Sequence, residues 1–146
     1  MSEVGFWDGT GVTPADLAVE VRRLAAEQPE HVYDKHDFPD WNVGAACKYT
    51  HTLEDNSKVP GCIVGQAIHN ITGKLVDQSL HAGGVLDFGF MRGENTTDDN
   101  GYNHWSPLAK FLANVQSHQD NGETWGYAVN LADDVTHEKN WWRSYN

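Results

Sequence analysis

The sequence is poor in cysteine and in long apolar runs, and each scarcity excludes a class of protein. Its 146 residues include two cysteines, too few for the disulfide framework of small secreted domains. No apolar stretch approaches the roughly 18–20 residues of a membrane span, and the first residues do not resemble a secretion signal. We therefore expect a cytoplasmic protein without a membrane partner. Reduced cysteines are favoured, although the spacing of Cys47 and Cys62 also permits a bond between them.

Positive charge is scarce as well. The chain has 10 lysines and arginines against 21 acidic residues, a formal net charge of -11. Non-specific binding of nucleic acid depends on lysine and arginine, which neutralise phosphates, so a nucleic-acid partner is disfavoured. The acids are spread over both halves of the chain and do not form the ordered rows that a nucleic-acid mimic needs. The partners that remain are basic, neutral or small.

Motifs for metals and common cofactors are missing too. The sequence contains no phosphate-binding loop, nucleophile elbow or dinucleotide glycine fingerprint. The two cysteines do not belong to the close pairs that bind zinc. The acidic run at Asp98 fails as a calcium loop, because Pro107 stands where the bidentate acid belongs. We expect neither a metal nor another cofactor.

Apolar residues at helical spacing predict about four helices around one core. The chain has the length of one ordinary domain, and 39% of its residues are hydrophobic, enough for a single core. A capping hydroxyl or a helix-starting proline marks most of the helix starts. We expect helices to begin at Thr13-Pro14, Cys62, Ser106-Pro107 and Thr124, the last two forming an antiparallel pair. Gly65 inside the second helix predicts a close contact with another helix.

Short β-type pieces lie between the first two helices, at His31–Tyr33 and Ala45–Thr52, and they predict one small hairpin there. A further short helix is predicted over residues 75–80. Residues 83–103 contain five glycines and a polar stretch, which predict a long loop, flexible over about 92–104. The fold class is therefore α+β, mostly helical, in one domain over residues 1–146.

The sharpest catalytic candidate is Cys62. At the start of a helix, free backbone N–H groups and the helix dipole favour a thiolate. A nearby histidine, namely His51, His69, His81 or His104, would have to act as its base. A small buried apolar residue at the helix start is the more common role for such a cysteine. The enzymatic hypothesis is a small hydrolase or transferase that uses Cys62 with a histidine such as His69.

The tail over residues 137–146 is rich in aromatic residues for a chain terminus. Trp141, Trp142 and Tyr145 are too many aromatics for a purely solvated segment. Either the tail docks on the domain, or it marks a surface for a partner. We take these three residues as the candidate binding residues.

Three segments carry a resemblance to a known group of proteins: CKY at 47–49, PGCIVGQAIH at 60–69 and VQSHQDNGETWGYA at 115–128. In these segments the chain resembles uncharacterised small proteins of actinobacterial phages. The resemblance implies a phage protein made in the host bacterial cytoplasm, and it transfers no activity. With the charge and the missing motifs, it favours a non-enzymatic accessory protein. Such a protein would bind a host or phage protein through an acidic surface, for example in host takeover or counter-defence.

Overall fold

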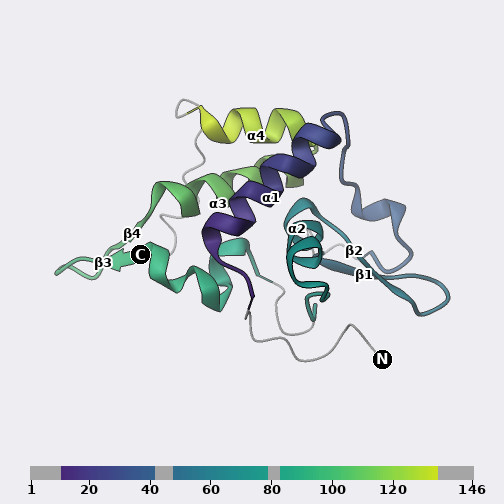
Figure 1. The fold of residues 1–146 in the computed structure, drawn as a ribbon, viewed down its shortest axis with the longest axis horizontal. Helices are drawn as coiled ribbons and strands as arrows, with labels where there is room; N and C mark the ends of the chain where they lie inside the picture. Colours follow the sequence, from purple (N-terminus) through teal and green to yellow (C-terminus); the bar gives the residue numbers. More distant parts are fainter. Residues whose placement is uncertain (1–10, 42–47, 79–82, 135–146) are drawn as a thin grey trace.

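The computed structural model describes residues 11–41, 48–78 and 83–134, which form helices and two small antiparallel hairpins (Figure 1). The α+β class predicted from the sequence is confirmed. In chain order the elements are α1 (Pro14–Glu27), the 3-10 helix η1 (Lys35–Asp37), β1 (Thr50–Thr52), β2 (Lys58–Pro60), α2 (Ile63–Thr72), the 3-10 helices η2 (Val85–Asp87) and η3 (Gly89–Glu94), β3 (Asn95–Thr97), β4 (Asn103–Trp105), α3 (Pro107–Asp120) and α4 (Trp125–Asp133). No helix in these ranges is long and apolar enough to cross a membrane.

Three helices begin at hydroxyl caps, as the sequence predicts. The side chains of Thr13, Ser106 and Thr124 each accept the N–H of the residue three positions on, at 3.1, 3.1 and 3.2 Å. A proline follows two of these caps at the first helical positions. Because each cap satisfies an N–H that the helix leaves unpaired, these starts are fixed locally.

The start of α2 is held from a distance instead. Its N-cap residue, Cys62, makes no side-chain capping bond. The N–H of Ile63 donates to Oε1 of Gln119, a buried residue of α3, at 2.9 Å. The helix ends at Gly73, whose φ of 73° is the left-handed conformation typical of glycine at this position. The side chain of Gln119, 56 positions further along the chain, therefore satisfies an N–H that a local cap would otherwise satisfy.

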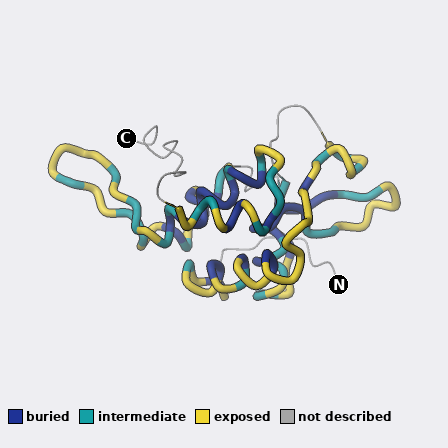
Figure 2. The backbone as a smooth tube through the Cα atoms, turned by 90° about the horizontal axis from the view of Figure 1, so that it is seen from above, coloured by how far each residue is buried: buried dark blue, intermediate teal, exposed yellow. Residues whose placement is uncertain are grey.

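α3 lies at the centre of the core, and Figure 2 shows much of it buried. α4 packs beside α3 and runs in the opposite direction, which confirms the predicted antiparallel pair (Figure 1). α1 packs against α2, α3 and α4. Gln116 of α3 accepts the N–H of Val85 at 2.8 Å and donates to the hydroxyl of Tyr49 at 2.9 Å. α3 thus contributes buried polar contacts as well as apolar packing.

A hairpin lies between α1 and α2 as predicted, but only β1 falls within a predicted strand, Ala45–Thr52, and its partner β2 was not predicted. β1 pairs with β2, with His51 opposite Val59. The predicted strand over His31–Tyr33 is wrong. The backbone there runs beside the start of α4, where the N–H of Trp125 donates to the carbonyl of His31 at 2.8 Å. Helix contact thus replaced the strand pairing that the local sequence favours.

The helix predicted over residues 75–80 does not form in its described part, 75–78. This segment is bound to β1 by side chains instead. Oε1 of Gln78 accepts the N–H of Tyr49 at 2.8 Å, and the hydroxyl of Thr50 donates to the carbonyl of Val76 at 2.6 Å. Residues 79 and 80 lie outside the described residues.

Two further expectations need correction. The close contact at Gly65 is with backbone, because a Cβ there would overlap the carbonyl of Tyr49, just before β1, and not with another helix. Residues 83–103, predicted as a long loop, contain η2, η3 and most of the β3–β4 hairpin, in which Thr96 pairs with His104. Strands of three mostly polar residues leave little hydrophobic alternation in a sequence, so no strand was expected there.

Candidate functional site

The structure places Cys62 in the core, as the N-cap residue of α2 with 0% of its surface exposed. Its sulfur is disulfide-bonded, whereas the sequence favoured reduced cysteines. The only other cysteine in the sequence, Cys47, lies outside the described residues. A disulfide sulfur has no thiolate, so catalysis by Cys62 would first require reduction and exposure of this residue.

Of the histidines proposed as bases for Cys62, His51 lies against the preceding residue, Gly61, and the others have different positions along the chain. His69 lies in the last turn of α2, at the opposite end of the helix from Cys62. His104 pairs with Asp98 on the exposed β3–β4 hairpin, at 2.8 Å. His81 lies outside the described residues. So do the candidate binding residues Trp141, Trp142 and Tyr145.

His51 belongs to a buried chain of hydrogen bonds that the sequence did not predict. Nδ1 of His51 lies 2.6 Å from Oδ1 of Asp40, and Nε2 lies 2.7 Å from the hydroxyl of Tyr33. Because a carboxylate only accepts, Nδ1 carries the proton and donates to Asp40. Nε2 then accepts the proton of the Tyr33 hydroxyl. The resulting order of hydroxyl, imidazole and carboxylate is also that of catalytic triads.

The electrostatics of this chain differ from those of an activated nucleophile. Burial raises the pKa of Tyr33 to about 12, so its hydroxyl keeps its proton. Burial also lowers the pKa of His51, although the carboxylate of Asp40 opposes this, so the ring stays neutral. Burial disfavours the charge of Asp40, but bonds from the Thr52 N–H and from His51 outweigh it, and the pKa of Asp40 is lowered. The proton therefore stays on tyrosine.

Packing encloses His51 completely. The ring of Phe38 stacks on the imidazole at a centroid distance of 3.7 Å, and His51 has 0% of its surface exposed. The hydroxyl of Tyr33 also accepts the N–H of Lys48 at 3.0 Å. Each polar group of the chain thus has a partner, and the chain fastens the 33–41 segment to β1. Its arrangement supports a structural role in the described conformation.

An open hollow of about 450 Å³ lies on the outer side of Tyr33, between residues 32–36 and 120–122. The two segments 30–37 and 120–123 together form what we call the acidic face. Their charged residues are one lysine, Lys35, and five acids: Glu30, Asp34, Asp37, Asp120 and Glu123. Val32 on this face is 43% exposed, and Trp41, which packs on His36 at 4.4 Å, is 42% exposed. Acidic and large apolar side chains therefore share one surface.

Asp120 is the most perturbed carboxyl of the acidic face. Burial raises its pKa from 3.8 to about 7, although the hydrogen bond from Gln119 and the charge of Lys35 oppose the shift. The amide of Gln119 donates to Oδ1 of Asp120 at 2.7 Å. A half-buried carboxyl with such a pKa is half-protonated near neutral pH, so a nearby cation would favour its charged form.

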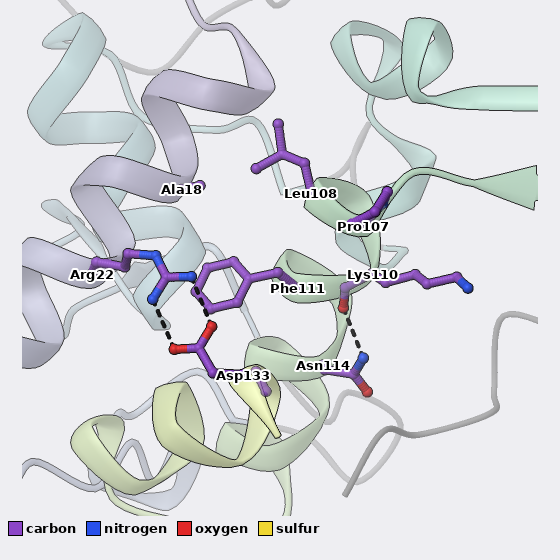
Figure 3. Close-up of a pocket in the computed structure, with 9 residues that line it drawn as sticks. Ala18, Arg22, Pro107, Leu108, Lys110, Phe111, Asn114 and Asp133 are labelled. Atoms are coloured by element: carbon purple, nitrogen blue, oxygen red, sulfur yellow. Dashed lines mark hydrogen bonds and ion pairs between the residues drawn. The ribbon is translucent and has the colours of Figure 1, made fainter. Parts of the chain in front are cut away.

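A second open groove, of about 620 Å³, lies between α1, α3 and the end of α4 (Figure 3). The guanidinium of Arg22 lies over the ring of Phe111, 3.9 Å from its centroid, and makes two 2.8 Å bonds to the carboxylate of Asp133. Leu108 and Ala18 add apolar surface, and Lys110 lies at the edge. This groove is mixed apolar and charged, and its Arg22 is already paired with its Asp133.

Comparison of the chain with models of protein families, with curated proteins and with solved structures finds no match. Within the described ranges, no group of three or more histidine, cysteine, aspartate or glutamate side chains is arranged to hold a metal ion. Two surfaces of the described residues combine charged and apolar side chains, the acidic face and the groove of Figure 3.

Sequence reasoning missed the members of the acidic face because its two segments are about 85 positions apart. No local pattern joins them. The fold brings them together by binding the turn after α1 to the start of α4, where the N–H of Gly126 donates to the carbonyl of Pro29 at 3.0 Å. The single available signal was the acidic composition of the whole chain.

Proposed function

We propose that this protein is a non-enzymatic accessory protein that binds a basic surface of a host or phage protein through its acidic face. Processes such as host takeover or counter-defence fit such a role. The phage assignment rests on the resemblance of the sequence segments at 47–49, 60–69 and 115–128 alone. The proposal of protein binding rests on the acidic face.

The observation that carries the proposal is the combination of charge and exposed apolar surface on this face. Exposed carboxylates attract a basic partner and steer its approach. Val32 and Trp41 provide apolar area that becomes buried on contact, and tryptophan is among the residues that contribute most to protein interfaces. The hollow beside Tyr33 has room for a side chain of the partner. A lysine or arginine entering there would lie close to Asp120.

Elsewhere, several basic side chains are already neutralised by acids of the same chain. Arg22 binds Asp133, and Arg23 binds Glu20 and Glu27. Both partners of each of these pairs lie on helices, α1 or α4. The acidic face has five acids against one lysine, Lys35, and two histidines, one of which, His36, pairs with Asp34 at 2.8 Å.

The alternative, a small hydrolase or transferase that uses Cys62, stays a prediction without a supporting observation. The residue is buried and disulfide-bonded. His51, the histidine beside the preceding Gly61, uses both ring nitrogens in bonds to Asp40 and Tyr33.

The test compares two variants that remove the same charge from different places. Glu30→Gln with Asp37→Asn neutralises two carboxylates of the acidic face. Asp16→Asn with Glu54→Gln neutralises two exposed carboxylates outside it. Each tagged protein is used to capture proteins from bacterial lysate at low and at high salt, and the captured proteins are quantified by mass spectrometry.

We expect one partner to be retained by the wild type and by the control pair, and to be lost from the face variant. Retention should weaken at high salt, because salt screens charges that are exposed at the edge of an interface. Equal retention by both variants would contradict the acidic face as the binding surface. Failure of the wild type to retain any partner would contradict the proposed function itself.

A further inference from the structure

The groove of Figure 3 brings apolar surface to water in a hollow of about 620 Å³. Pro107 is exposed there, and Leu108 and Ala132 are half-buried. Leu108 of α3 and Ala132 of α4 also pack against the hydrophobic core, so the apolar lining of the groove is continuous with the core. A hollow with such a lining favours an apolar or aromatic occupant.

The charges in the groove already have partners. Arg22 makes two 2.8 Å bonds to Asp133 and lies over the ring of Phe111. Lys110 has an interaction of its own within the chain, and the amide of Asn114 donates to the carbonyl of Lys110 at 2.8 Å. A charged ligand would compete with these contacts, whereas an apolar one would not. Apolar contact therefore selects the occupant.

The described part of the chain ends at this groove. Ala132 and Asp133, in the last turn of α4, line it, and Asp134 caps the helix with an extended backbone, φ -96° and ψ 112°. Two residues, Val135 and Thr136, separate Asp134 from the tail over residues 137–146. The tail lies outside the described residues, but it joins them at the edge of the groove.

The tail is long enough to span the groove. The groove follows α3 from Pro107 to Asn114, about 10 Å at a rise of about 1.5 Å per helical residue. The seven positions from Asp134 to Trp141 can cover up to about 23 Å, at about 3.3 Å per residue. Trp141 and its neighbour Trp142 can therefore reach any part of the groove lining.

The tail also supplies the side chains that such a groove binds. Three of its ten residues, Trp141, Trp142 and Tyr145, are large aromatics. Burial of one aromatic side chain removes roughly 150–250 Å² of surface from water, a large contribution for a short segment. The sequence left two roles open for the tail, docking on the domain or binding a partner. An aromatic segment joined directly to an apolar groove favours docking.

We propose that the tail docks in the groove of its own chain, with an indole of the Trp141–Trp142 pair on the apolar wall of Leu108 and Ala132. Because the tail is covalently attached, its effective concentration at the groove is on the order of millimolar, which favours it over a separate peptide or a second copy with the same side chains. No residue that lines the groove belongs to the acidic face, so docking is independent of the proposed partner binding.

Covalent footprinting of the full-length protein with a photoactivated carbene reagent, read by mass spectrometry, tests the proposal. In the wild type, Trp141 and Trp142 should be labelled less than in the urea-unfolded chain. In the double variant Trp141→Ala with Trp142→Ala, labelling of Leu108 should rise at least about twofold, because the docking equilibrium loses at least about tenfold with both indoles removed. Val19 of α1, 68% exposed and outside the groove, is the internal control and should keep its labelling.

A second pair of variants perturbs the groove and leaves the tail intact. Ala132→Glu places a carboxylate in the groove lining and should raise the labelling of the two indoles at least about twofold, because a buried unpaired charge disfavours the docked state. Asn130→Glu adds the same charge to an exposed position of α4 outside the lining and should leave the labelling unchanged. Urea unfolding of each variant checks that it is folded.

The protection of Leu108 and of the two indoles should be the same at every protein concentration, because the contact lies within one chain. Protection that grows with concentration would assign the groove to a second copy and overturn the proposal. Equal labelling of Leu108 in the wild type and the double variant would also overturn it. So would wild-type indoles labelled as heavily as in the unfolded chain, which would leave the tail free for a partner.

Discussion

Asp120 offers the strongest test of the electrostatics of the acidic face. Its carboxyl lies in the wall of the hollow, and burial raises its pKa from 3.8 to about 7. In the unfolded chain the same carboxyl loses its proton near pH 4. Between these pH values the folded state holds a proton that the unfolded state has released, so rising pH favours unfolding. The Asp120→Asn variant keeps an oxygen to accept from Gln119 but cannot ionise.

The size of the effect follows from the pKa difference. One pKa unit corresponds to about 1.36 kcal/mol, so a rise of about 3 units gives an upper limit of about 4 kcal/mol. Partial solvent access at the hollow reduces this to about 2 kcal/mol. Because the pKa of Asp120 is higher in the folded state than in the unfolded chain, the free energy of unfolding falls as the pH rises. The favourable contribution of Asp120 is complete below pH 4 and is lost as the pH rises through 7.

Urea unfolding at pH 5, 6, 7 and 8, followed by tryptophan fluorescence, measures this contribution. Trp125 is fully buried and should report the transition. The difference in unfolding free energy between Asp120→Asn and the wild type should grow by about 1 kcal/mol from pH 5 to pH 8. The control for the loss of one charge is Asp37→Asn, which neutralises an exposed carboxylate of the same face. A difference that is constant, or that shrinks as the pH rises, would refute the reasoning.

Three further predictions concern the buried contacts, each measured as the free energy of unfolding in urea at pH 7. Gln119→Leu removes the acceptor for the first N–H of α2 and should cost roughly 1–3 kcal/mol; an unchanged stability would contradict its role at the helix start. Tyr33→Phe removes the hydroxyl that donates to His51 and should cost a similar amount, roughly 1–3 kcal/mol; an unchanged stability would show that the buried chain contributes nothing. Gly65→Ala drives a Cβ into backbone and should cost about 1–3 kcal/mol, whereas Gly89→Ala, with open space around it, should change little; equal effects would contradict the close packing at α2.

The helices were predictable because their signals are local. Thr13, Ser106 and Thr124 each cap a helix within four residues, and the apolar spacing that follows is read directly from the sequence. The β3–β4 hairpin was not predictable in the same way. Its strands have three residues each, and the first is Asn-Thr-Thr, so neither length nor alternation indicates a strand. Its bonds are made by asparagine and aspartate side chains, which typically indicate turns.

The candidate sites depend on contacts between distant positions. The sequence placed Cys62 correctly at the start of a helix and favoured its burial, but its disulfide bond follows from the tertiary fold. The bonds from His51 to Asp40 and Tyr33 cross 11 and 18 positions, through a loop that no periodic pattern describes. The composition predicted an acidic protein, but only the tertiary fold shows that acids of residues 30–37 and 120–123 lie on one face.

The contact between α1 and α4, the first and last described helices, affects how the chain folds during its synthesis. Arg22 of α1 and Asp133 of α4 are 111 positions apart, yet they form the two-bond pair at the groove. During synthesis at about 5–20 residues per second, Arg22 is added roughly 5 to 20 seconds before Asp133. Until then the apolar face of α1 lacks the helix that covers part of it. The packing of α1 is therefore complete only after α4 has been made. A fragment that stops short of α4 should be a substrate for chaperones and proteases.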